Sequence, residues 1–433
     1  MLDLLYSWCR RNSWKAVFGL ILPCITSMSL LAQPQDSWTL EQSIRRAVEI
    51  APEIRGSQAA VSARQGALQQ AGAWPNPQIE LRADDKIGKD DGTGGTGFTQ
   101  LAFSQPLPLS GRLGHQQAVA GAELDAAHAD LLYRQIQLET QVAQRFHGLQ
   151  LAEERLHLAE QRLQLADDLQ DIGHRRSQAG ELSKLESLRL DLIRESAQQI
   201  FDKAEGSYNE ALSRFRAYLG LSAEVVSKLA PLKAFEPMPD LQQLQDGLSR
   251  HSALLAARHR LEAAQSGVDL ARAGRLPDPS LRLFRERDFL NGRHQDVTGI
   301  GVGITVPLWD RNSGRIDESR ALVIQSQSEL QALERDLNSR LQQSYLHLNH
   351  LVQQGKHYRT RVFEPAQKVF DLTRKAYASG EVEILSLIDA NNTYFDTRER
   401  YLELLQEAWL EAAELRLAAG LTLVTTKLDT DHE

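Results

Sequence analysis

The chain repeats one series of landmarks after about 200 residues, and this internal duplication constrains its fold more than any other feature. The matching positions are Pro75 and Pro277, Pro106 and Pro307, Gly180 and Gly380, and Gly220 and Gly420. Because this period is far too long for a solenoid, the pattern indicates two copies of one module. We predict a first repeat over residues 33–230, a proline-rich linker over 231–240, a second repeat over 241–421 and a tail over 422–433.

Each predicted repeat contains a pair of long helices, over about 112–220 and about 315–420. Arg112–Ile172 contains no proline, and at 1.5 Å per residue it would form a rod of about 90 Å. Arg315–Ala378 is interrupted only by Pro365, where we expect a kink. Helices of this length are rare in compact domains and favour coiled-coil packing.

Two apolar series recur every seven residues along the first long helix and lie on nearly opposite sides of it. They are Leu149, Leu156 and Leu163, and Leu151, Leu158, Leu165 and Ile172. A helix with an apolar stripe on each flank needs a neighbour on each side, like a stave in a barrel. A helix in the middle of a large soluble bundle would carry the same stripes, so both interpretations stay open at this point.

After each Pro-x-Pro pair, the apolar residues alternate with polar or small ones, which predicts strands. The alternating apolar positions are Ile79, Leu81, Ala83, Leu101, Phe103, Leu281, Leu283, Ile300, Val302, Ile304 and Val306. We predict hairpins over about 77–107 and about 279–307, with loops at Gly88–Gly97 and Asp288–Asp296. Trp74 and Trp309 flank the outermost strands at one end, as interfacial aromatics of a membrane protein would. Solvent-facing hairpins of a soluble protein are the alternative.

The predicted fold class is mainly α with a small antiparallel β part, a duplicated long-helix coiled-coil module that carries two β-hairpins. Four strands cannot close a barrel, and open strand edges in lipid leave backbone groups unpaired at a cost of several kcal/mol each. The smallest membrane barrels have about 8 strands. If the strands enter lipid, several copies must therefore combine them, and the helices would continue as a tunnel outside the membrane.

Residues 1–32 are typical of a secretory signal peptide. Arg10, Arg11 and Lys15 precede a mostly apolar stretch that ends at Ala32, near which we expect cleavage. Both cysteines of the chain fall inside this segment, so the mature protein would have neither disulfide nor thiol chemistry. Lipidation of Cys24 is the alternative.

Composition excludes several classes of function. A net charge of −8 argues against a nucleic-acid partner, and a mean hydropathy of −0.38 excludes a polytopic helical membrane protein. No catalytic motif stands out, so we predict no enzyme activity and no cofactor. His347, His350 and His357 have a spacing that permits a metal site, yet a strong site needs further ligands, and we interpret them as solvated helix residues.

These landmarks together resemble the TolC-like outer membrane efflux proteins, from about Trp38 to Leu421. The paired Pro-x-Pro entries and the paired turns at Gly180 and Gly380 carry the resemblance. Gly380, followed by Leu385-Ser386-Leu387-Ile388-Asp389-Ala390, is similar to the family's Gly-x5–8-Leu-x-Asp-Ala segment. The block Ser104–Arg112 is most similar to the CzcC-type branch, which is associated with heavy-metal efflux.

The resemblance implies a homotrimer whose twelve strands form one transmembrane β-barrel on a periplasmic α-helical tunnel. It implies a location in outer membrane lipid, a periplasmic adaptor protein and an inner-membrane pump of the RND type as partners, and passive conduction of divalent heavy-metal cations. Drug efflux or type I secretion through the same fold is an alternative. A soluble periplasmic coiled-coil scaffold or adaptor is an alternative of another class.

The same resemblance assigns roles to the two helical turns. The adaptor-docking tips would be Gly180, Glu181, Leu182, Gly380, Glu381 and Val382. Asp389 matches the aspartate of the motif and would line the periplasmic aperture, unless it caps or pairs on the helix surface. Ser386 stands where a second acidic residue is often found, and Glu186 is a candidate aperture residue in the first repeat.

Overall fold

The computed structural model describes residues 37–83, 98–180, 182–222, 229–232, 239–290 and 293–423. The predicted signal peptide, Cys24, the loop Gly88–Gly97 and most of the linker and the tail lie outside these residues. The chain divides into two units, Met1–Asp36 and Ser37–Glu433, and every element below belongs to the second unit.

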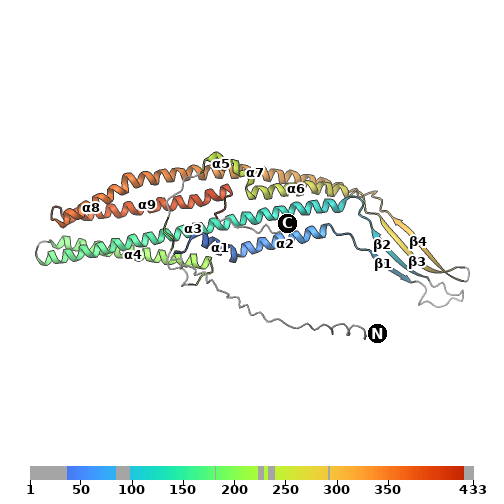
Figure 1. The fold of residues 1–433 in the computed structure, drawn as a ribbon, viewed down its shortest axis with the longest axis horizontal. Coiled ribbons are helices and arrows are strands. Elements are labelled where there is room, and N and C mark those ends of the chain that lie inside the picture. The colour runs from blue at the N-terminus through green and yellow to red at the C-terminus, as the bar shows by residue number, and fades with distance from the viewer. Residues whose placement is uncertain are drawn as a thin grey trace, which may run out of the picture. The chain divides into compact units, whose positions relative to one another are not determined.

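The elements occur in the same order in the two halves of this unit (Figure 1). The first half contains α1 (Leu40–Ile50), α2 (Pro52–Ala71), β1 (Gln78–Ala83), β2 (Thr99–Pro106), α3 (Arg112–Gln178) and α4 (Lys184–Tyr218). The second half contains α5 (Leu241–Gly247), the 3₁₀ turn η1 (Leu248–Arg250), α6 (Ser252–Ala273), β3 (Ser280–Leu290), β4 (Arg293–Gly303), α7 (Ser313–Tyr358), the π-helical turn η2 (Arg359–Phe363), α8 (Glu364–Ala378) and α9 (Ile384–Ala419). The predicted fold class, mainly helical with a small antiparallel sheet, is confirmed.

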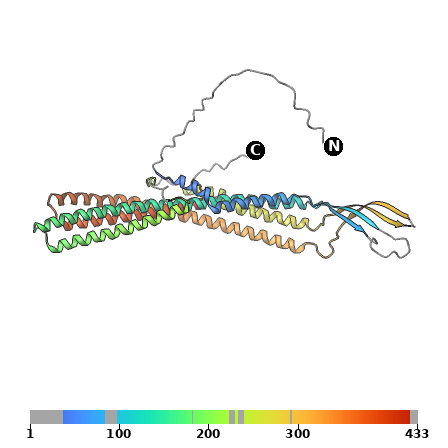
Figure 2. The same cartoon turned by 90° about the horizontal axis from the view of Figure 1, so that it is seen from below.

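Each half is built on one long helix with two shorter helices beside it, as Figures 1 and 2 show. The 67 residues of α3 correspond to about 100 Å, longer than the predicted Arg112–Ile172. α2 packs on the part of α3 nearer the sheet, and α4 packs on the remainder. α1 meets the end of α4 where Arg46 Nε donates to the Leu219 carbonyl at 3.4 Å. In the second half, α6 and α9 flank α7 and α8 in the same way.

Local sequence signals set the helix ends. Thr39 with Gln42 and Ser183 with Glu186 form capping boxes at the starts of α1 and α4. Pro52 is the first residue of α2, where the missing N–H costs no hydrogen bond. Near Pro365 the chain forms the π-helical turn η2 over Arg359–Phe363, because the proline cannot supply the N–H that would continue an α-helical ladder. The predicted interruption is therefore a local change of helix type just ahead of the proline.

Among the residues that the structure describes, three hydrophobic clusters make up the core. The first lies among α1, α3 and the end of α4, and the second lies among α5, α6, α7 and α9. Equivalent residues of the two repeats occupy these clusters: Ile44 and Leu244, Ile54 and Leu254, Leu149 and Leu348, and Phe215 and Leu415. The third, which we call the tip cluster, joins α3 and α4 to α8 and α9. Leu149 belongs to the first cluster, whereas Leu151 and Leu158 belong to the tip cluster, as two opposite apolar stripes require.

The two hairpins form a single antiparallel sheet in the order β1-β2-β3-β4, because β2 also pairs with β3. The predicted loop over Asp288–Asp296 is wrong, since β3 continues to Leu290 and β4 starts at Arg293. Ion pairs from Arg285 and Arg287 to Asp296 support these polar strand ends. β4 ends at Gly303, before the predicted Ile304 and Val306. Its partner β3 begins only after Pro279, and a proline cannot donate to the ladder.

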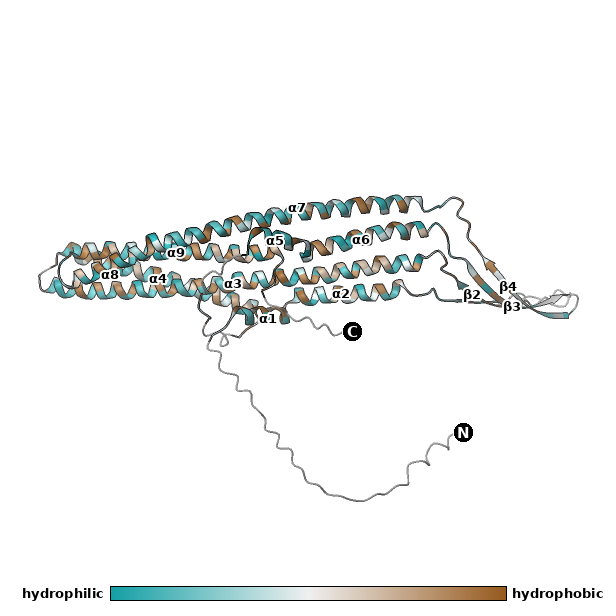
Figure 3. Ribbon diagram, turned by 45° about the horizontal axis from the view of Figure 1, so that its top comes forward, coloured by the Kyte–Doolittle hydropathy of each residue, from teal (hydrophilic) through white to brown (hydrophobic). Residues whose placement is uncertain are grey.

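None of the helices in the described part of the chain is long and apolar enough to cross a membrane. Figure 3 shows brown and teal residues interleaved along the helices.

Candidate functional site

The two reversals of the helix pairs lie at the same end of the helical body, opposite the sheet (Figure 1). Gly180 and Gly380 have φ values of +76° and +79°, a conformation that glycine adopts without a steric penalty. Gly380 donates to the Tyr377 carbonyl at 3.1 Å, and Glu381 donates to the Ala376 carbonyl at 2.8 Å, which closes the end of α8. Glu181 lies outside the described residues.

The predicted docking residues differ in exposure. Gly180, Gly380 and Glu381 are exposed. Leu182 and Val382 are half-buried and pack against the tip cluster, so they tie the two reversals to one hydrophobic core. Only the exposed members of the predicted set are free to contact another protein without repacking.

Asp389 lies on α9, six residues into the helix from its start at Ile384. Its side chain is exposed, whereas Leu387 and Ala390 beside it are buried in the helix packing. Among the described residues it has no hydrogen bond or ion pair, so its carboxylate is open to solvent. Glu186 has a structural role instead. Hydrogen bonds from the Ser183 hydroxyl and backbone N–H hold the pKa of its carboxyl below the ordinary value.

Three arginines link α3 to α9, and the sequence analysis missed them. Arg155 Nε donates to Glu399 Oε1 at 2.8 Å, and Arg162 Nη2 donates to Asn392 Oδ1 at 3.2 Å. Arg398 on α9 donates to Gln161 Oε1 at 3.1 Å. The seven-residue spacing of Arg155 and Arg162 was a usable signal, but their partners lie more than 200 residues away in sequence.

An exposed apolar stripe on α4 was also missed. Leu185, Leu188 and Leu192 are 62%, 52% and 70% exposed and share one face of the helix at i, i+3 and i+7. On α8, Val369 and Leu372 are exposed in the same manner. Both sets lie near the reversals, where they leave apolar side chains uncovered in this chain.

One face of the sheet is apolar and exposed. A row of directly paired residues crosses all four strands: Ile79, Phe103, Leu283 and Ile300. Their exposed fractions are 74%, 41%, 48% and 68%, which is typical of a surface that another apolar phase covers. Trp74 and Trp309 precede β1 and follow β4, and they are 62% and 93% exposed at the helical end of the sheet.

The opposite face of the sheet is polar. Arg282 donates to Glu80 at 3.1 Å and to Gln100 at 3.0 Å, and Gln100 donates to Glu286 at 3.0 Å. Phe284 lies over Gly299, where an added Cβ would be 2.3 Å from the ring. The sheet therefore separates an apolar surface from a hydrogen-bonded one, and β1 and β4 leave an unpaired edge on each side.

Two buried histidines hold the middle of the helical body. His147 stacks on Trp409 with ring centroids 4.1 Å apart and bonds to Gln150 at 2.8 Å. Burial lowers the pKa of His147 to about 4. His251 caps α6 by accepting from the Ala253 N–H, and its Nε2 lies 3.2 Å from the Leu417 carbonyl. Burial lowers its pKa as well.

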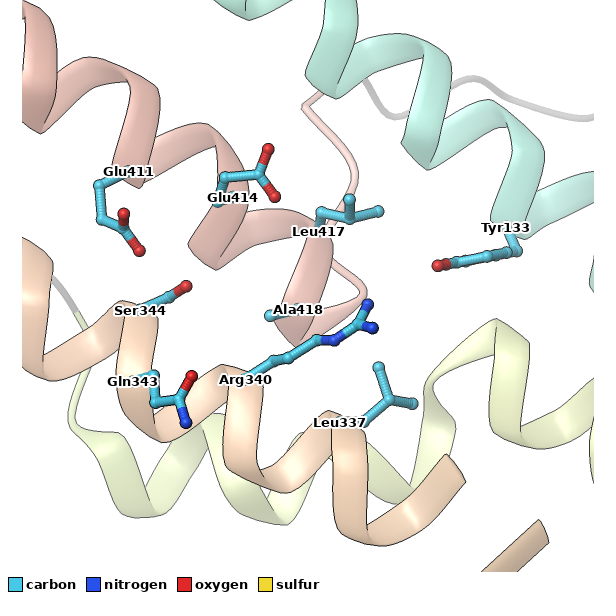
Figure 4. A pocket seen from close by; sticks show the side chains of 9 residues that line it. All are labelled: Tyr133, Leu337, Arg340, Gln343, Ser344, Glu411, Glu414, Leu417 and Ala418. Atoms are coloured by element: carbon cyan, nitrogen blue, oxygen red, sulfur yellow. The ribbon is translucent and has the colours of Figure 1, made fainter. Parts of the chain in front are cut away.

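A cavity of about 340 Å³ lies among α3, α7 and α9 (Figure 4). Arg340 from α7 points into it beside Glu414 from α9 and Tyr133 from α3. His347 pairs with Glu411 at 3.0 Å. No group of three or more potential metal ligands occurs within the described ranges. Within these ranges His347, His350 and His357 therefore form no common metal site.

Comparison with known proteins gives consistent results. A family model described as "Outer membrane efflux protein" matches residues 43–221 and again 243–421. The cobalt-zinc-cadmium resistance protein CzcC of Cupriavidus metallidurans is 24% identical over 88% of this chain and 90% of its own length. The pyoverdine export outer membrane protein OpmQ of Pseudomonas aeruginosa is 22% identical over 88% of this chain and 84% of its own length.

Solved structures have the same fold. A crystal structure of CusC, described in connection with folding and transmembrane channel formation, matches with a TM-score of 0.72 at 19% identity. The match covers 88% of this chain and 92% of that one. The outer membrane protein VceC of Vibrio cholerae matches with a TM-score of 0.70 at 18% identity, over 88% of this chain and 96% of that one.

Proposed function

The chain belongs to the outer membrane efflux protein family, and from this premise we propose that it conducts divalent heavy-metal cations out of the cell. Members of the family are channels and not enzymes. The chain is accordingly the outer membrane channel component of a tripartite efflux system, and its helical tunnel lies in the periplasm. The substrate and the partners are the parts that need a test.

The proposal of membrane insertion rests on one observation. The apolar row Ile79, Phe103, Leu283 and Ile300 lies on a sheet with two free edges. In hydrocarbon each unpaired N–H or C=O at those edges costs several kcal/mol. A homotrimer removes the cost, because three copies contribute four strands each to one closed barrel of twelve. The polar face with Arg282 and Glu80 would then line the pore, and Trp74 and Trp309 would lie at the periplasmic interface.

Metal cations are favoured as cargo by the likeness to CzcC, whose name states cobalt, zinc and cadmium resistance. The open carboxylate of Asp389 supports this choice. Three copies of Asp389 around the periplasmic aperture would attract cations and repel anions without binding them tightly, as conduction requires. The alternative to test is an organic cargo, because the similar protein OpmQ is named for pyoverdine export.

The exposure of the residues at the two reversals indicates where a partner protein would bind. We assign adaptor contact to the exposed Gly180, Gly380 and Glu381, with Glu181 as a further candidate, and tip packing to Leu182 and Val382. The periplasmic adaptor would connect the channel to an inner-membrane pump of the RND type. Residues 1–32 would direct secretion and be cleaved near Ala32.

Three experiments test this function. The purified protein should form conducting pores in planar bilayers, and its absence from carbonate-washed outer membranes would contradict insertion. Deleting the gene should lower tolerance to at least one of zinc, cadmium, cobalt, copper and silver, and the cloned gene should restore it. If the deletion leaves the tolerance to all five metals unchanged and causes a new sensitivity to an organic compound, the cargo is organic and the metal proposal is wrong.

A further inference from the structure

The outward face of the sheet changes from apolar to basic with distance from the helices. Directly beyond the apolar row, Arg285 lies opposite Leu101 and Thr298, and Arg287 in the next row lies opposite Thr99 and Asp296. Because side chains two residues apart in a strand share a face, both arginines belong to the same face as Leu283.

Both arginines share one carboxylate. Arg285 Nη2 lies 3.2 Å from Asp296 Oδ2, and Arg287 Nε lies 3.3 Å from Asp296 Oδ1. The side chains of Arg285, Arg287 and Asp296 are 69%, 63% and 45% exposed. Two guanidinium groups on one carboxylate leave a net charge of about +1 and several free N–H donors, which suits a further anion with several oxygens.

The position of this basic pair matches the outer boundary of a bilayer. Val306 lies beyond the end of β4 and three residues before the exposed Trp309, and it is eight positions along the chain from Thr298, which faces Arg285. An extended chain of that length spans about 26 Å, or about 20 Å along the membrane normal at a tilt of about 40°. This height is close to the apolar band of about 25 Å in membrane barrels. The helical tunnel lies in the periplasm, so the arginines lie toward the outer leaflet.

From this register and charge we propose that Arg285 and Arg287 form a binding site for a phosphorylated lipid headgroup of the outer leaflet. The proposal rests on the outer membrane location and is independent of which cargo the channel conducts. β3 lies between β2 and β4 in the sheet, away from the β1 and β4 edges through which a second copy would join. The face of β3 is therefore free for lipid, and a phosphate there would complete the hydrogen bonding of the two guanidinium groups.

Lipid retention by the purified full-length protein in detergent tests the site. The probes are diphosphoryl lipid A and the same lipid with its phosphates removed, and native mass spectrometry counts the bound copies. The double variant R285Q/R287Q should bind the diphosphoryl lipid about tenfold or more weakly than wild type, since it loses both guanidinium charges that attract the phosphates. D296N, which removes the competing carboxylate, should bind it more tightly than wild type. Arg320→Gln, an exposed arginine on α7, should bind it like wild type.

Equal binding of both lipids by wild type, or equal binding of the diphosphoryl lipid by wild type and R285Q/R287Q, would overturn the proposal. Loss of the oligomer in the double variant would also overturn it, because the pair would then be a contact between copies. Conductance in phosphatidylcholine bilayers, measured in parallel, reports on the channel itself. An unchanged conductance together with weaker lipid retention is the expected result, whereas loss of conductance in wild type would count against the proposed function alone.

Discussion

Asp389 differs from most acidic residues of the helical body because no described basic residue neutralises it. On the same helix, Asp396 and Glu399 are paired with Arg162 and Arg155. Because no positive charge among the described residues offsets it, the Asp389 carboxylate lowers the electrostatic potential of the space that it faces. In a trimer three such charges would surround one opening, where a low dielectric strengthens their field.

Asp389→Asn removes this charge at constant side-chain volume. We expect the preference for cations over anions to fall severalfold, because the ring no longer concentrates cations at the aperture. The reversal potential in planar bilayers under a salt gradient measures this preference. Glu329→Gln, an exposed carboxylate on α7, is the matched control and should change nothing. The same reversal potential for wild type and Asp389→Asn would rule out an aperture role.

His147 gives the helical body a defined dependence on pH. Its folded-state pKa of about 4 lies below the ordinary histidine value of 6.5, so the unfolded chain binds more protons between these two values. Stability is therefore complete above pH 6.5 and falls as the pH drops toward 4. Over this pH interval the free energy of unfolding should fall by about 3 kcal/mol.

His147→Gln should remove most of this dependence, at the cost of lower stability at neutral pH through the lost contact with Trp409. Thermal unfolding of wild type and variant between pH 4 and pH 7 measures the difference. His128→Gln, an exposed histidine on α3, should keep the wild-type slope. A wild-type slope in His147→Gln would show that other groups cause the acid sensitivity.

At the level of single elements, the start of α4 depends on its capping box. Ser183→Ala removes the acceptor for the Glu186 N–H and the hydrogen bond that the serine hydroxyl donates to Glu186 Oε2, so we expect the first turn of α4 to lose about 1 kcal/mol. Hydrogen exchange of the amides over residues 184–190 should become faster. Ser187→Ala, one turn further inside the helix, should leave the exchange rate unchanged or slower, because alanine favours helix interiors.

The sheet offers a test of packing between adjacent strands. Gly299→Ala places a Cβ 2.3 Å from the Phe284 ring, whereas the Cβ of Gly301→Ala meets only Arg282 at 3.9 Å. The first substitution should therefore cost about 1–3 kcal/mol and lower the yield of assembled protein in the outer membrane. The second should assemble like wild type. Equal yields would mean that the ring moves aside freely.

Local patterns predicted the elements well wherever one physical signal dominated. The absence of proline from Arg112–Ile172 and the seven-residue leucine spacing were sufficient for α3. The loop prediction over Asp288–Asp296 failed because polar residues there form cross-strand ion pairs, which composition cannot reveal. The pairing of β2 with β3 and the partners of Arg155 and Arg162 join residues far apart in sequence, so no local period encodes them.

At the scale of the whole molecule, contacts join the duplicated halves along their length, including α3 against α6 and the stack of His147 on Trp409 in the middle. At the sheet end, β2 pairs with β3, and Arg112 binds Asp278 at 2.7 Å. At the tip end, the tip cluster and the arginines between α3 and α9 hold the two reversals together. The sheet contact is a continuous backbone ladder, whereas the tip contact consists of side chains only. A relative movement of the halves would therefore begin at the tips.

Weakening the tip contact should open the periplasmic end without disturbing assembly. We expect Arg155→Gln with Arg162→Gln to raise single-channel conductance severalfold, because the double variant removes the ion pairs with Glu399 and Asp396 that hold α9 against α3. Arg194→Gln is the matched control. It removes the pair between Arg194 and Asp167, which joins α4 to α3 within one repeat and should not change conductance. Equal conductance in the double variant and wild type, with both assembled in the membrane, would show that the tip cluster holds the two reversals together without these ion pairs.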